Sequence, residues 1–198
     1  PEHILPQEEP LRQAIAKHPL HPNLGEWLDE VSVAVVERGA KIEHDRNNRA
    51  AILHLARHMP LLPEYEYILL HELTHVGDRV DPSFAYSEDD RHSLSDFAKL
   101  KMMELWNVYI DSRLHHHGKF VLGEQDKGVY CTINGKAQMA PYSIEGKLLC
   151  HISLLKSTGM PEAEKTVREI WRCPDRRLTF GELIVLAKQA VRTASATR

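Results

Sequence analysis

The strongest constraint on this chain is a short segment, 63–76, that reads as one amphipathic helix. It ends in His71-Glu72-Leu73-Thr74-His75. Residues four apart lie on the same face of a helix, so His71 and His75 can approach one metal ion while Glu72 projects beside it. The segment therefore predicts a helix that carries a metal site.

The residues around this motif favour a helix over a chance cluster of histidines. The chain has 13 histidines, so the bare motif is only suggestive. Pro63 suits a first helical turn and Glu66 suits the positive end of the helix dipole. Leu69 and Leu73 belong to an apolar stripe that can be buried against a core. The helix is predicted to end near Gly77, because glycine commonly terminates helices.

Two histidines four apart with a glutamate between them form the HExxH arrangement of zinc metallopeptidases. Zn²⁺ lowers the pKa of water to about 7, and a nearby glutamate can take its proton as the water attacks a carbonyl group. The sequence predicts Zn²⁺ as cofactor, with His71 and His75 as ligands and Glu72 as general base. The implied function is hydrolysis of peptide bonds.

A catalytic zinc site needs a third protein ligand as well as an open position for water. The run 97–117 contains no glycine or proline and is predicted to form one long helix, or two broken ones. Asn107 and Asp111 lie one turn apart on the same face of that helix, and Glu104 lies nearly one turn earlier. This helix is the expected donor of the third ligand.

HELTH followed by a helix with WNVYIDSRL resembles the zincin metallopeptidases of the gluzincin type. The bacterial putative metallopeptidase domains linked to von Willebrand A modules are the most similar group, over about residues 40–118. The resemblance implies His71, His75 and Asp111 as ligands, Glu72 as base and Asn107 as a supporting residue. The chain departs from the pattern in its long loop between the helices and in Ile110, where an acid is frequent.

A second resemblance implies a different third ligand. The stretch 91–100, RHSLSDFAKL, is similar to the start of the second helix in SprT-like proteases, where a third histidine follows HExxH after a loop. That resemblance implies His92. If the helix is unbroken, Asp111 lies nearly 30 Å further along it than His92, at about 1.5 Å per residue. Asp111 is favoured on the Trp-Asn-Asp-Arg combination, with His92 as the alternative.

Two strand-like runs precede the motif, at 40–45 and 49–55, and the polar residues 46–48 between them suit a hairpin. The run 51–55 is expected to form the edge of the cleft and to pair with an extended substrate. His44, His54 and His58 are expected at the surface. Residues 24–38 are predicted to form an amphipathic helix.

The expected fold is α+β and mostly helical: zincin-like, with a small β-hairpin or sheet packed on the HExxH helix and a helical remainder. We expect a single domain over 1–198, with a core at about 24–118 and a helical part at about 143–192. Helices are predicted at 143–158 and 161–171, and another after a capping box at 179–182. The stretch 118–142 is expected to be a loop that roofs the cleft.

Composition limits the remaining function classes. The net charge of −3 provides no electrostatic case for nucleic acid. The chain lacks an apolar run of about 18 residues, so no membrane span is predicted, and a cytoplasmic location is expected. The partner is therefore predicted to be a peptide or protein substrate.

A zincin-fold metal-binding module with a regulatory or interaction role is the alternative function. An active peptidase also needs a donor that stabilises the oxyanion. The candidates are Tyr130, Tyr142, His151 and Arg113.

Overall fold

The computed structural model describes residues 8–123, 126–133, 136–160 and 162–195. Its elements in chain order are α1 (Glu8–Ala16), α2 (Leu24–Trp27), β1 (Glu30–Val36), β2 (Ala40–Asp45), β3 (Ala50–Ala56), the 3₁₀ turn η1 (Met59–Leu61), α3 (Tyr65–Val80), α4 (Glu88–His92), α5 (Asp96–His116), β4 (Tyr130–Ile133), β5 (Lys136–Met139), α6 (Ile144–Ser157), α7 (Ala163–Arg172) and α8 (Phe180–Ser195). The predicted mostly helical α+β fold is confirmed. No helix in the described ranges is both long and apolar enough to cross a membrane.

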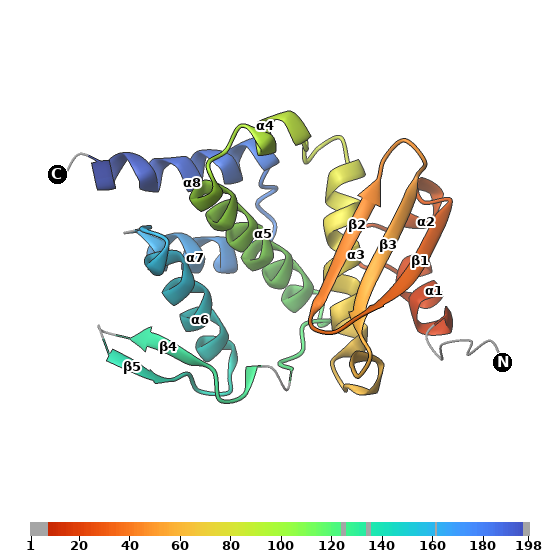
Figure 1. Cartoon of the computed structure of the whole chain (residues 1–198), viewed down its shortest axis with the longest axis horizontal. Helices are drawn as coiled ribbons and strands as arrows, with labels where there is room; N and C mark the ends of the chain where they lie inside the picture. Colours follow the sequence, from red (N-terminus) through yellow and green to blue (C-terminus); the bar gives the residue numbers. More distant parts are fainter. Residues whose placement is uncertain (1–7, 124–125, 134–135, 161, 196–198) are drawn as a thin grey trace.

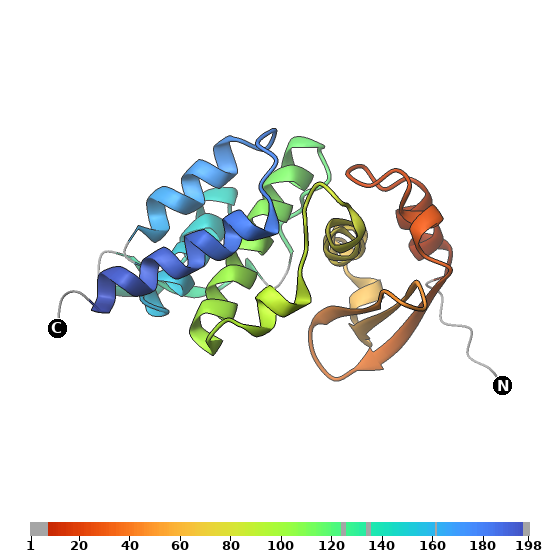
Figure 2. The same ribbon diagram turned by 90° about the horizontal axis from the view of Figure 1, so that it is seen from above.

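Helix α3, which carries the HExxH motif, lies in the middle of the molecule (Figure 1). Seen from above, it is viewed nearly end-on, with the three-stranded sheet and α1 on one side and α5 to α8 on the other (Figure 2). Helix α3 buries apolar residues of its own between these two sides, including Leu69, Leu70 and Leu73. The motif is therefore held on a helix that both halves of the molecule pack against.

The three-stranded sheet has the order β1-β3-β2. Strand β3 pairs antiparallel with β2, which confirms the predicted hairpin, and parallel with β1. The run 51–55 is therefore the centre of the sheet, and its predicted place at the edge of the cleft is wrong. Among the described strands, the edge that faces α3 belongs to β2.

The predicted helix over 24–38 is also wrong. Only Leu24–Trp27 is helical, and Glu30–Val36 forms strand β1. Val31, Val33 and Val35 alternate along this strand, and β-branched residues favour strands. Every residue of β1 has a partner on β3, from Glu30 opposite Ala50 to Val36 opposite Ala56. This long-range pairing overrides a helical periodicity that fits the same residues.

Helix α3 continues past its predicted end near Gly77, as far as Val80. Gly77 is buried, and a Cβ atom at this position would lie 2.2 Å from the ring of His21. The glycine allows the segment before α2 to approach the helix closely; it does not terminate the helix. The backbone N–H of Asp81 closes the last turn on the carbonyl of Gly77.

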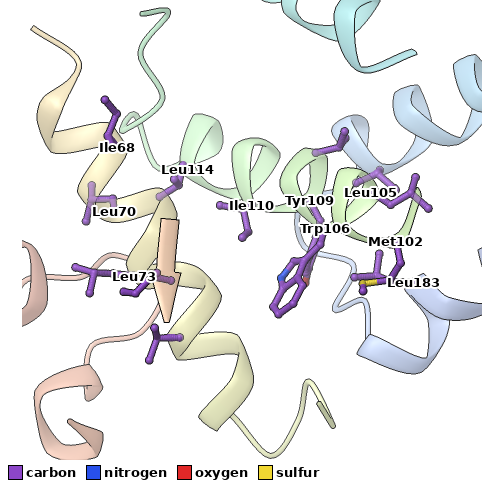
Figure 3. Packing of buried hydrophobic residues seen from close by; sticks show 14 of the residues in the cluster. Ile68, Leu70, Leu73, Met102, Leu105, Trp106, Tyr109, Ile110, Leu114 and Leu183 are labelled. Carbon is purple, nitrogen blue, oxygen red and sulfur yellow. The ribbon is translucent and has the colours of Figure 1, made fainter. Parts of the chain in front are cut away.

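Helix α5 is a single unbroken helix, as the run without glycine or proline predicts. Its start lies beside α4, away from α3, and its later turns return toward α3 (Figure 1). Ile110 and Leu114 lie on the part of α5 nearer to α3, whereas Met102 lies toward Leu183 of α8 (Figure 3). The late position of Asp111 on α5 therefore brings it to the motif without any break in the helix.

The C-terminal helices begin where their capping signals place them. Ser143 caps α6 by accepting a hydrogen bond from the Gly146 backbone. The predicted capping box before α8 is confirmed, because Thr179 and Glu182 exchange hydrogen bonds between side chain and backbone. The stretch predicted as a loop at 118–142 contains the hairpin β4–β5, which packs on α6.

Candidate metal centre and cleft

A cavity of about 230 Å³ lies beside α3. Its walls come from four parts of the chain. They are Gly39, Ala40 and Met59 from the sheet and η1, Tyr67, Ile68, His71 and Glu72 from α3, Asn107 and Asp111 from α5, and Lys147 and His151 from α6. We call this cavity the cleft. Three of the predicted site residues, His71, Glu72 and Asp111, line it together.

Asp111 lies beside the first histidine of the motif. Its Oδ1 is 2.7 Å from Nδ1 of His71, and the hydroxyl of Tyr67 donates to the same oxygen at 2.6 Å. The carboxylate is 1% exposed. Burial alone would lower the pKa of His71, but the charge of Asp111 and the hydrogen bond to it outweigh burial and raise that pKa. The ring of His71 is thereby locked with Nδ1 toward Asp111.

His75 lies next to His71, with ring centroids 5.2 Å apart. Its Nε2 is 3.1 Å from Oδ1 of Asn107. Its Nδ1 is buried without a hydrogen-bond partner among the described residues. Burial, with the nearby charge of His71, lowers the pKa of His75 to about 3. The ring is therefore neutral at physiological pH, as a metal ligand must be.

The orientation of His71 fits a metal ligand, but the predicted set of three ligands is not assembled among the described residues. A ligating histidine usually donates its second ring nitrogen to a carboxylate, and His71 makes this contact with Asp111. No three His, Cys, Asp or Glu side chains within the described ranges are arranged to hold a metal ion. The side-chain oxygens nearest to the two imidazoles are Oδ1 of Asp111, 2.7 Å from His71, and Oδ1 of Asn107, 3.1 Å from His75.

The alternative third ligand, His92, lies at the end of α4 and does not line the cleft. Its side chain is 66% exposed and its Nε2 contacts Glu88. The structure thus brings Asp111 to the motif and leaves His92 on the surface.

Glu72 lies in the same cleft as His71. Burial raises the pKa of Glu72, while the charges of His71 and Arg79 and a hydrogen bond from the Ile42 backbone oppose the rise. Ile42 belongs to β2, so the free edge of that strand faces the glutamate. This edge takes the place that the sequence assigned to residues 51–55.

His151 is the one predicted oxyanion donor that lines the cleft. Its Nδ1 is 2.6 Å from Glu104, and its Nε2 is 3.6 Å from Oδ2 of Asp111. Burial alone would lower its pKa, but the hydrogen bonds and charges of Asp111 and Glu104 raise it to about 9. His151 is therefore protonated at neutral pH.

The other candidate donors are engaged elsewhere. Arg113 makes two hydrogen bonds to Asp78, and the hydroxyl of Tyr142 donates to the carbonyl of Leu122. Tyr130 is 70% exposed. None of the three lines the cleft.

Among the residues of the cleft that were not predicted, Tyr67 and Lys147 have polar side chains. Tyr67 precedes His71 by four positions, so helical spacing alone was enough to place it beside the motif. Lys147 precedes His151 by the same spacing on α6 and is 2.9 Å from Asp126. Its pKa is raised because Asp111 and Asp126 outweigh the effect of burial. Lys147 could have been found from its helical spacing to His151, but the sequence did not place His151 in the cleft.

A buried polar cluster supports α3 away from the cleft. Asp78 contacts His21 at 3.0 Å, accepts a hydrogen bond from the Trp106 indole at 2.7 Å and pairs with Arg113. The charge of Arg113 and these hydrogen bonds hold the pKa of Asp78 well below its usual range, although burial acts in the opposite direction. This cluster ties α3 to α5 and to the segment before α2.

Comparison with known proteins adds no relative: no family model, curated protein or solved structure matches the chain.

Proposed function

We propose that this protein is a zinc-dependent peptidase whose metal is held by His71 and His75, with Glu72 as general base. The observation that carries the proposal is the contact between Asp111 and Nδ1 of His71, which leaves Nε2 of that ring available to a metal. Glu72 and His71 line one cleft. The HExxH motif is thus accompanied by the carboxylate that orients a ligating histidine.

Asn107 is the proposed third donor, and Asp111 the residue that orients His71. Both oxygens of Asp111 face other side chains, Oδ1 toward Tyr67 and His71 and Oδ2 toward His151. The amide oxygen of Asn107 is already directed at His75. Zn²⁺, when bound, supplies a Lewis acid that polarises a carbonyl and acidifies water.

Glu72 accepts the proton of the attacking water and passes it to the leaving nitrogen. A carboxylate with a raised pKa is a stronger base than an ordinary one, so it takes the proton of water more readily.

His151 is placed to stabilise negative charge on the substrate oxygen. It is protonated and lines the cleft, and its Nε2 lies 3.6 Å from Oδ2 of Asp111, which is longer than a normal hydrogen bond. A preformed donor of this kind stabilises an oxyanion strongly in a site that excludes water. Glu104 acts through His151, because it binds Nδ1 and so directs Nε2 into the cleft.

Strand β2 is the proposed docking edge for an extended peptide. Its outer edge pairs with no strand of the described chain, and the backbone of Ile42 reaches Glu72. A peptide added at this edge gains main-chain hydrogen bonds that do not depend on its sequence.

The test is the Glu72→Gln variant. This variant should keep its zinc and its melting temperature, because Glu72 is not a ligand, and should lose about 10²–10⁴-fold in the rate of peptide cleavage. Zinc content by elemental analysis and cleavage of unfolded protein substrates are measured on the same samples. Equal rates in wild type and variant would disprove the role of Glu72.

A metal-binding module without peptidase activity is the second candidate. It is favoured by the absence of a third His, Cys, Asp or Glu donor within the described ranges. Zinc-loaded wild-type protein that cleaves no member of a broad substrate panel would support this function over the first.

A further inference from the structure

We infer that the protein prefers peptides with an acidic side chain two or three residues from the scissile bond, and that Arg79, which lies outside the lining of the cleft, recognises this side chain. The inference rests on the proposed peptidase function and names a specificity determinant for it.

Arg79 lies on the same side of α3 as the proposed catalytic glutamate. Seven residues separate it from Glu72, which is nearly two full helical turns. At about 1.5 Å per residue, Arg79 is about 10.5 Å further along the helix axis. Its charge is close enough to affect both Glu72 and His75. It opposes the rise that burial causes in the pKa of Glu72, and it adds to the fall that burial causes in the pKa of His75.

The guanidinium of Arg79 has no carboxylate partner among the residues that the structure describes. It makes none of the ion pairs found there, and its Nε is buried without a hydrogen-bond partner. The group lies over the rings of Tyr86, at 5.4 Å, and Trp106, at 5.8 Å, which hold it by cation–π contacts. By contrast, Arg113 on α5 is paired with Asp78.

Strand β2 connects the two positions. Ile42 reaches Glu72, and His44, two residues later, lies close enough to Arg79 for that charge to add to burial in lowering the pKa of His44. His44 was expected at the surface, but it is half-buried and its Nε2 has no partner among the described residues. The strand therefore runs along α3 from the glutamate toward Arg79. Nε2 of His44 and Nε of Arg79 are both without hydrogen-bond partners among the described residues.

An extended peptide docked on this edge reaches Arg79 within a few residues. At about 3.3 Å per residue, about three residues span the 10.5 Å between Glu72 and Arg79. A half-buried guanidinium gains most from a carboxylate, which it can bind through two parallel hydrogen bonds. Asp or Glu is therefore the side chain that this position favours.

The test compares peptides that are identical except for a single Glu or Gln at each position from one to four residues on either side of the scissile bond. Wild type should cleave the Glu peptide with a kcat/KM about tenfold higher at one position two or three residues away. Arg79→Gln should abolish this ratio, and Arg79→Glu should invert it, so that the Gln peptide is cleaved faster than the Glu peptide. Arg91→Gln is the matched control, because Arg91 is half-exposed on α4 and already paired with Glu88.

Binding separates this inference from the proposed chemistry. The same peptides are titrated into the Glu72→Gln protein and into Glu72→Gln/Arg79→Lys, which keeps the charge if loss of the cation impairs folding. Tighter binding of the Glu peptide, reduced in the Lys variant, supports recognition by Arg79 even if wild type cleaves nothing. Equal affinities for the Glu and Gln peptides, or a Glu/Gln ratio that Arg79→Gln leaves unchanged, would overturn the inference.

Discussion

At the scale of single residues, one carboxylate organises the cleft. Asp111 accepts from Tyr67, contacts Nδ1 of His71 and faces Nε2 of His151. It therefore sets the orientation of one proposed ligand and contributes to the charge of the proposed oxyanion donor. A buried carboxylate with these partners has a pKa below its usual range, against the effect of burial, and stays ionised.

The ligand assignment predicts the zinc affinity of three variants. Asn107→Ala removes a donor, and Asp111→Ala frees the ring of His71, so each should weaken zinc binding by about 10–100-fold. His92→Ala should leave affinity unchanged, because His92 lies on the surface. Affinity is measured by competition with a chromophoric chelator. Loss of zinc in His92→Ala alone would return the third ligand to that residue.

The Glu104–His151 pair predicts a shift in a measurable pKa. Glu104→Gln removes one of the two carboxylates that raise the pKa of His151 to about 9, so this pKa should fall toward 6.5. Because the protonated ring is the proposed donor, the alkaline limb of the cleavage profile should move to lower pH. NMR titration of the ring, assigned with His151→Gln, gives the pKa directly. An unchanged pKa would show that Asp111 alone sets it.

At the scale of elements, the position of α3 depends on close contact with the segment before α2. Gly77 lies against the ring of His21, and the next residue of the helix, Asp78, contacts Nε2 of that ring at 3.0 Å. His18 binds the carbonyl of Leu70 on the same helix. These contacts hold the HExxH helix on the side away from the cleft and leave His71 and Glu72 to line it.

Gly77→Ala should destabilise the protein by about 1–3 kcal/mol, because the new methyl group meets a buried ring that has little freedom to move. Gly181→Ala is the matched control. The nearest atom there is a Thr179 hydroxyl 3.9 Å away, and alanine favours the helix by up to about 1 kcal/mol. Urea unfolding measures both. Equal stability of Gly77→Ala and wild type would mean that the segment before α2 can move away.

At the scale of the whole molecule, buried histidines make stability depend on pH. Burial and the charge of His21 lower the pKa of His18 to about 4. The unfolded chain therefore binds a proton at His18 below about pH 6.5, whereas the folded protein does so only near pH 4. The contribution of His18 to stability is complete above pH 6.5 and is lost as the pH falls toward 4.

The expected loss from His18 is about 2 kcal/mol between pH 7.5 and pH 5. His18→Gln should be less stable at pH 7.5 but should show a smaller decrease on acidification. Asp78 does not interfere in this window, because its depressed pKa makes its contribution fall only below its ordinary value of 3.8. Urea unfolding at several pH values measures the difference. Parallel curves for wild type and variant would contradict the effect.

The sequence by itself determined the features that depend on neighbours along the chain. Helix α3 follows apolar periodicity, α5 follows a run without glycine or proline, and the Thr179–Glu182 box marks the start of α8. The β2–β3 hairpin follows a polar turn. HExxH itself depends only on helical spacing. These signals are local, because the hydrogen bonds and capping contacts that satisfy them lie within a few residues.

Tertiary structure decided the rest. Residues 30–36 became a strand because β3 offered a partner, and β3 became central once β1 had joined it. The packing of α5, α6 and β2 around α3 decides which atom of His71 faces Asp111 and which of the four candidate donors lines the cleft. Spacing along a helix gives the face of a side chain. The atoms that this face meets come from distant segments, so only the packed chain determines them.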